Sequence, residues 1–154
     1  MPMCANRVEH HSRRTIDAAD VGREVARVSA NESSIVAAYV FGSIARGTAT
    51  PLSDIDVALL LDPGAAAADV CGRITDALSR RFGTDRIDVV TLDRAPTPLA
   101  YRVIREGRLI ICRDGARVER FVAHTVLQYL DFKPLRSRAF QLLRSNIIKT
   151  ADGR

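Results

Sequence analysis

Four short apolar runs, separated by longer amphipathic segments, limit the folds open to this chain more than any other feature. The runs lie at residues 35–41, 55–61, 86–92 and 109–112 and are rich in valine, isoleucine and leucine. Buried runs of this length and composition are typical of β-strands. Strands that alternate with helices predict an α/β (α+β) domain built on one small mixed sheet flanked by helices.

Apolar residues spaced by three or four predict the helices between these strands. The predicted helices are one over 18–28, one over 70–82 closed by Gly83, one that opens at Pro96 or Pro98 and stops at Gly107, and a long one over 118–129. Pro134 interrupts the last helix because it lacks the N–H that the helix needs. A second helical piece is expected after it.

The length of 154 residues fits one domain. We expect this domain at 15–150, after a flexible tail at 1–14. No apolar run approaches the roughly 18–20 residues that span a bilayer, and the N-terminus lacks the apolar core of a secretory signal. The three cysteines are widely spaced, which argues against a disulfide scaffold or a cysteine zinc site. A cytoplasmic protein without membrane association is the default expectation.

The basic excess is confined to the end of the chain. Residues 117–154 hold eight basic and three acidic residues, which accounts for the whole net charge of +5. Such a segment could dock an acidic protein surface or nucleic acid, or it could be a solvated helix face. The arginines are not interleaved with aromatic residues, so direct nucleic-acid binding is not expected.

Two aspartates stand where the second strand begins. Asp54 and Asp56 are two residues apart, so strand alternation places both carboxylates on one face. Two carboxylates so close repel each other unless a cation lies between them. Asp88, in the third strand, completes a three-carboxylate cluster if that strand neighbours the second. Such a cluster can hold two Mg²⁺ ions for phosphoryl or nucleotidyl transfer.

A glycine-serine turn follows the first strand and leads into a short helical start. Gly42 allows the backbone to approach a ligand closely, and Ser43 offers a hydroxyl and an N–H suited to phosphate. The turn is not a Walker A loop, because no Gly-Lys-Ser/Thr follows.

The spacing from Gly42-Ser43 to Asp54-x-Asp56, with Asp88 as a third acid, resembles the signature of the DNA polymerase β-type nucleotidyltransferase superfamily. Within it, the short chain and the segments IDVVTL (87–92), PLAYRVIREG (98–107) and QYLDFKPL (128–135) resemble the minimal nucleotidyltransferases of the MntA antitoxin family, from type VII HEPN/MNT toxin–antitoxin systems. The similarity runs from residue 35 to about residue 140.

This resemblance implies a minimal polymerase β-type fold and an antitoxin that transfers AMP from ATP to a tyrosine of a HEPN ribonuclease toxin. It would form a hetero-oligomer with that toxin. It further implies that Asp54, Asp56 and Asp88 bind magnesium and carry the catalysis. The implied nucleotide- and phosphate-binding residues are Gly42, Ser43, Arg46 and Ser53.

Several alternatives stay open on the sequence alone. Asp54 and Asp56 could form a turn or a helix cap, Asp88 could pair with Arg86, and Arg46 could be an exposed turn residue. Arg102 and Arg105 could reach a nucleotide or a partner, or form a solvated helix face. Alternative functions are a small-molecule nucleotidyltransferase, acting for example on an aminoglycoside, and an antitoxin that binds the toxin without catalysis.

Overall fold

The computed structural model describes residues 16–131 and 134. Along the chain lie α1 (Ala18–Ser29), β1 (Ile35–Phe41), α2 (Gly42–Arg46), β2 (Ile55–Leu61), α3 (Ala67–Phe82), β3 (Ile87–Thr91), α4 (Thr97–Glu106) and β4 (Arg108–Cys112). A further helix covers 115–131. The expected tail at 1–14, the helical piece after Pro134 and most of the C-terminal basic residues lie outside the described residues.

Local sequence signals explain where these elements begin and end. The Asp17 carboxylate accepts a hydrogen bond from the Asp20 N–H at 2.7 Å and so caps the start of α1. Gly83 ends α3 in the left-handed conformation, at φ +64°. Predicted and observed bounds agree for β1 and β2. The third strand is shorter than predicted by one residue at each end, and β4 begins one residue earlier.

The four strands form one open sheet in the order β3-β2-β1-β4. Strand β1 runs antiparallel to both β2 and β4, whereas β2 and β3 are parallel and joined through α3. The expected small mixed sheet is therefore confirmed. The third strand does neighbour the second, which is the condition that the sequence left open for Asp88.

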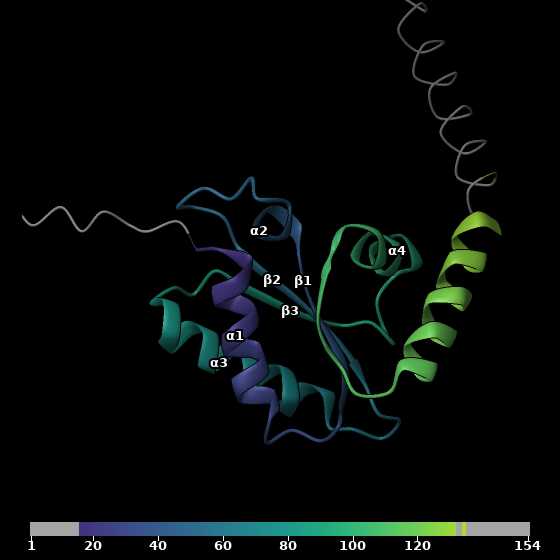
Figure 1. Cartoon of the computed structure of the whole chain (residues 1–154), viewed down its shortest axis with the longest axis horizontal. Coiled ribbons are helices and arrows are strands. Elements are labelled where there is room, and N and C mark those ends of the chain that lie inside the picture. Colours follow the sequence, from purple (N-terminus) through teal and green to yellow (C-terminus); the bar gives the residue numbers. More distant parts are fainter. Residues whose placement is uncertain (1–15, 132–133, 135–154) are drawn as a thin grey trace, which may run out of the picture.

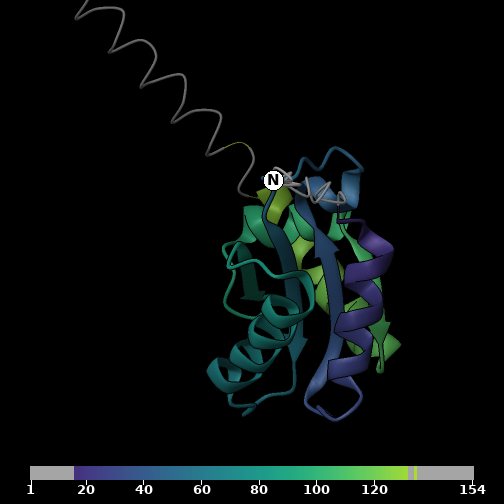
Figure 2. The same cartoon turned by 90° about the vertical axis from the view of Figure 1, so that its left-hand side faces the viewer.

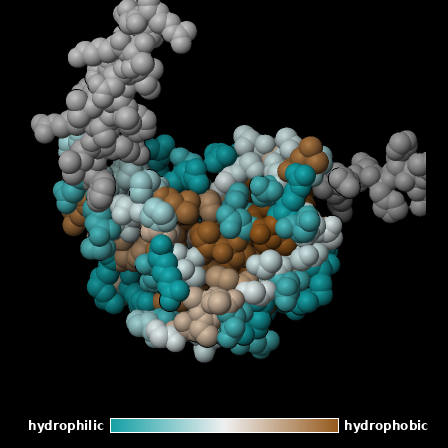
Figure 3. Space-filling model, turned by 180° about the vertical axis from the view of Figure 1, so that it is seen from behind, coloured by the Kyte–Doolittle hydropathy of each residue, from teal (hydrophilic) through white to brown (hydrophobic). Residues whose placement is uncertain are grey.

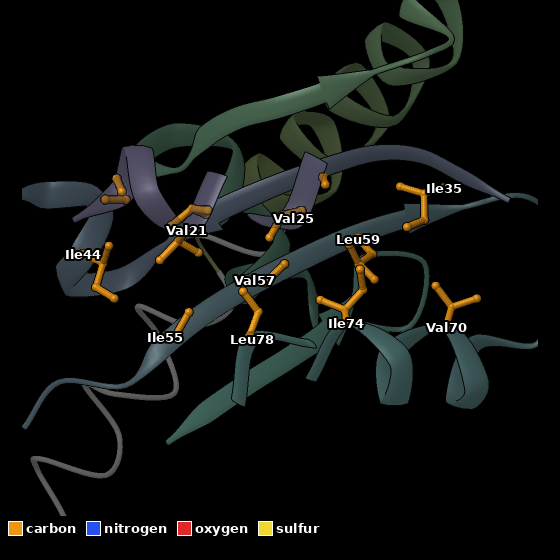
Figure 4. Close-up of a cluster of buried hydrophobic side chains, with 14 of the residues drawn as sticks. Val21, Val25, Ile35, Ile44, Ile55, Val57, Leu59, Val70, Ile74 and Leu78 are labelled. Carbon is orange, nitrogen blue, oxygen red and sulfur yellow. The ribbon is translucent and has the colours of Figure 1, made fainter. Parts of the chain in front are cut away.

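Helices cover both faces of the sheet. Helices α1 and α3 lie side by side on one face (Figures 1 and 2). Their apolar residues form a core with alternate residues of the strands (Figure 4), including Val21, Val25, Ile55, Val57, Leu59, Val70, Ile74 and Leu78. The opposite face packs against α4 and the helix over 115–131, through Leu60, Ala100, Val103 and Val118. The stacked rings of Tyr101 and Tyr129, 3.8 Å apart, join these two helices.

Strand alternation assigns the aspartates to one of these faces. Ile55 and Val57 lie in the core under α1 and α3, while Ala58, Leu60 and Val90 pack on the opposite side. Asp56 and Asp88 therefore point to the side of the sheet that carries α4.

The surface is mixed in character. Figure 3 shows apolar residues gathered near the middle of the rear face, with hydrophilic residues around them. Among the described residues, no helix is both long enough and apolar enough to cross a membrane.

Candidate active site

Gly42, the first residue of α2, has a backbone conformation and surroundings that only glycine accommodates without strain. Gly42 has φ +71°, and a Cβ atom built on it would lie 1.9 Å from Asp56 Oδ2. Any side chain at position 42 would collide with this carboxylate. The sequence predicts a close approach of Gly42 to a ligand, and the structure shows a close approach to an acidic side chain.

The three aspartates come together at one end of the sheet. Asp56 lies in β2 directly opposite Asp88 in β3, and Asp54 stands just before β2 on the same face. Asp56 is half-buried, and the other two are exposed. None of the three carboxylates has a hydrogen bond or an ion pair within the described part of the chain. Strand pairing, and not a turn or a helix cap, therefore accounts for the position of Asp56 and Asp88, while Asp54 lies in the loop directly before β2.

The alternative that Asp88 pairs with Arg86 is wrong. The Arg86 guanidinium instead donates a hydrogen bond to the Leu52 carbonyl, and the Arg86 carbonyl accepts one from the Ile55 N–H at 2.9 Å. Arg86 thus ties the loop before Asp54 to the beginning of β3. This anchor fixes the position of Asp54 relative to Asp88.

The local electrostatics set Asp56 apart. Burial raises its pKa above the ordinary value, and the carboxylates of Asp88 and Asp54 raise it further. The guanidinium groups of Arg102 and Arg46 act in the opposite direction. Ionisation of Asp56 is therefore less favourable than that of an ordinary aspartate, and a cation bound beside it would offset this difference.

The donor set fits magnesium in its chemistry, because Mg²⁺ takes hard oxygen ligands from a few carboxylates. Asp56 interacts electrostatically with Asp54 and Asp88, and none of the three carboxylates has a hydrogen bond or an ion pair among residues 16–131. As positioned, no three acidic, histidine or cysteine side chains of those residues converge closely enough to form a ready ligand group. Asp54, Asp56 and Asp88 could therefore hold magnesium only after their side chains close around it.

A stability measurement tests this electrostatic picture. The raised pKa means that the unfolded chain releases the Asp56 proton at a lower pH than the folded chain does. The contribution of Asp56 to the free energy of unfolding therefore falls as the pH rises from its unfolded-state pKa to its folded-state pKa. It stays lowered at higher pH. Asp56→Asn should raise the melting temperature at pH 7 in EDTA, and the gain should vanish below the ordinary pKa of aspartate.

Added Mg²⁺ supplies the second arm of this test. It should raise the melting temperature of the wild type and leave that of Asp56→Asn nearly unchanged. A variant less stable than the wild type in EDTA at pH 7 would contradict the picture.

A hollow of about 360 Å³ lies beside these carboxylates. It is lined by Phe41, Gly42, Ser43, Arg46, Leu52, Ser53, Asp54, Asp56 and Arg102. The predicted nucleotide-binding residues are therefore all present in its wall. Asp88 is not part of the lining, and it meets the site through its register with Asp56.

The polar side chains of this wall differ in whether they already have a hydrogen bond or an ion pair. The Ser43 hydroxyl has no hydrogen-bond partner among residues 16–131. The Ser53 hydroxyl already accepts a hydrogen bond from the Thr50 N–H at 2.8 Å, so it also braces the loop. Arg46 is exposed at the end of α2 and pairs with Glu106 of α4 at 3.5 Å. Its contact with phosphate stays a prediction.

Two residues of the wall, Phe41 and Leu52, were not predicted as site residues. For a third, Arg102, the sequence leaves open a nucleotide or partner contact and a solvated helix face. The sequence treats Arg102 and Arg105 alike, and only Arg102 lines the hollow. The signal that separates them is tertiary, because it depends on how α4 lies across the sheet.

A larger groove of about 1180 Å³ adjoins the hollow. It runs between the start of α1, the loop at 49–53 and the end of α3, and it shares Leu52 and Ser53 with the hollow. Leu52 is 63% exposed at the boundary of the two. A polypeptide lying in this groove would pass next to the carboxylates.

Comparisons with known proteins agree with this geometry. Residues 23–116 match the family model described as polymerase beta, nucleotidyltransferase. No curated protein matches the sequence.

Solved structures of toxin–antitoxin complexes share the fold. A chain from a toxin–antitoxin crystal structure with AMP-PNP superposes with a TM-score of 0.68 at 22% identity, covering 80% of this chain and 98% of that one. A chain from the toxin–antitoxin complex MntA-HepT gives 0.61 at 21% identity, covering 80% and 97%. A chain from the complex of a tri-AMPylated Shewanella oneidensis HEPN toxin with an MNT antitoxin gives 0.63 at 20% identity, covering 80% and 96%.

Proposed function

Because the chain belongs to the polymerase beta nucleotidyltransferase family, we propose that it is an antitoxin that transfers AMP from ATP to a tyrosine of a HEPN ribonuclease toxin. One observation supports the transferase chemistry. Three carboxylates without a hydrogen bond or an ion pair among the described residues lie on one face of the sheet, near a glycine-serine turn. The similar MNT antitoxin stands in complex with an AMPylated HEPN toxin, which supports the proposed acceptor. This chain would form a hetero-oligomer with its toxin.

Each residue of the site has a proposed role. Asp54, Asp56 and Asp88 would hold two Mg²⁺ ions, while Gly42, Ser43, Arg46 and Ser53 would bind the phosphates of ATP. The bound ions would offset negative charge on the α-phosphate and on the leaving pyrophosphate.

The reaction needs a base as well as a bound nucleotide. The tyrosine oxygen forms a bond to the α-phosphorus, the bond from that phosphorus to the bridging oxygen of the β-phosphate breaks, and pyrophosphate leaves. A phenol has a pKa near 10, so it needs help to lose its proton at neutral pH. Asp88 is exposed and unpartnered among the described residues, and we assign it the acceptance of this proton.

The groove beside the hollow gives the toxin a place to lie. It meets the site at Leu52 and Ser53, next to Asp54. A toxin segment seated there could present a tyrosine to the nucleotide without entering the core of the sheet.

Intact mass spectrometry tests the proposal. A HEPN protein encoded beside this chain is incubated with it, ATP and Mg²⁺, and the expected result is a mass gain of one or more AMP groups on that protein. Omission of either ATP or Mg²⁺ should prevent the gain.

Other results would point to other functions. A stable complex with no mass gain would replace the proposal with an antitoxin that acts by binding alone. A mass gain on an aminoglycoside, with none on the HEPN protein, would indicate a small-molecule transferase.

A further inference from the structure

One cation in the wall of the hollow has no assigned task. Arg102 lines it together with Asp54 and Asp56. Its guanidinium has no hydrogen bond and no ion pair among residues 16–131, although it is close enough to lower the pKa of Asp56. A guanidinium carries five N–H donors that favour planar anions such as carboxylate and phosphate.

The neighbouring arginines are already engaged. Arg46 pairs with Glu106 at 3.5 Å, and Arg105 pairs with the same carboxylate at 3.4 Å. Arg108 donates to the Ala45 carbonyl at 3.1 Å. Glu106 therefore partly neutralises Arg46 and Arg105, whereas Arg102 has no such carboxylate paired with it among residues 16–131.

The backbone that carries Arg102 is well fixed. Tyr101 stacks on Tyr129 with nearly parallel rings, and Val103 is fully buried against the sheet. Gly107, at the end of α4, packs tightly against the backbone. A Cβ atom added to it would lie 2.4 Å from the Val103 carbonyl oxygen and 3.4 Å from the Val40 carbonyl oxygen. The side chain thus projects toward the hollow from a fixed backbone, so ligand binding needs to order only the side chain itself.

We propose that Arg102 is a nucleotide-binding residue whose guanidinium contacts the phosphate tail of the substrate, in the same hollow as the Gly42-Ser43 turn. The hollow is open and polar, and its lining combines this cation with carboxylates that would hold magnesium. An anionic phosphate chain in the hollow would contact both. This inference rests on the nucleotide binding of the proposed function and not on the identity of the acceptor.

Binding calorimetry in the presence of Mg²⁺ tests the assignment with three ligands: ATP, GTP and inorganic tripolyphosphate. Arg102→Gln should weaken all three by about tenfold or more, as expected for the loss of a charge-assisted hydrogen bond. Arg102→Lys, which keeps the charge, should lose less. Arg105→Gln is the matched control, because it lies three residues further on the same helix and outside the hollow, and it should bind as the wild type does.

Several outcomes would overturn the assignment. Unchanged binding by Arg102→Gln would do so, and so would equal weakening by Arg105→Gln. A loss confined to ATP would show contact with the base and not with the phosphates. Because Arg102 is exposed, its replacement should leave the melting temperature unchanged, so a folding defect is separable from lost binding.

The readout is independent of transfer to the toxin. If the three ligands respond as expected while no AMP reaches the HEPN protein, the assignment of Arg102 stands and the proposed function falls. If AMP is transferred and the variant binds all three ligands normally, the proposed function stands and the assignment of Arg102 falls.

Discussion

Asp56→Asn should lower the rate of nucleotidyl transfer at least about a thousandfold while the protein stays folded. Asp56 is the half-buried member of the three carboxylates, and it lies between the other two, opposite Asp88 and two residues after Asp54. The amide of asparagine keeps the shape of the side chain and removes its charge. The loss should therefore come from weakened magnesium binding and not from altered packing.

Steady-state transfer of labelled AMP measures this effect, with circular dichroism as the check on folding. Asp76→Asn is the matched control, because Asp76 is exposed on α3, on the other side of the sheet. It should transfer at the wild-type rate. Transfer by Asp56→Asn within tenfold of the wild type would rule out a central role for this carboxylate.

Gly42→Ala should cost both activity and stability. The added Cβ would lie 1.9 Å from Asp56 Oδ2, so the carboxylate must move, and the residue must also adopt φ +71°. The backbone conformation costs about 1–2 kcal/mol for an L-residue. A displacement of about 1 Å at a reacting site can lower the rate about a hundredfold.

A second glycine separates these two effects. Gly64 has φ +85°, and nothing lies within 4 Å of a Cβ built on it. Gly64→Ala should lose a similar amount of stability in urea denaturation and keep its transfer rate. Equal losses of activity in the two variants would show that backbone strain, and not the position of Asp56, explains the effect.

Much of the fold could be predicted because the signals are local. Strands β1 and β2 are continuous apolar runs, and Gly83 marks the end of α3. Strand alternation alone places Asp54 and Asp56 on one face. These features depend on residues that are close in the sequence, which is why the predicted bounds of β1 and β2 agree with the structure.

The remaining features depend on contacts between distant segments. The parallel register that sets Asp88 opposite Asp56 arises from the pairing of β3 with β2 and the packing of α3 against β3. The contact of Gly42 with Asp56 and the projection of Arg102 into the hollow require the relative positions of α2, β2 and α4. No periodicity or spacing in the sequence distinguishes Arg102 from Arg105.

The strands that carry the carboxylates differ in how strongly they are held in the sheet. Asp54 and Asp56 belong to the continuous β1–α2–β2 unit, in which both strands are almost wholly buried. Asp88 stands on β3, an edge strand with a ladder partner on one side only. Edge segments open at a lower free energy than central ones. Local fraying of β3 would therefore separate the third carboxylate from the other two while the hydrophobic core persists. Under the proposed function, transfer activity would then be lost well before the fold.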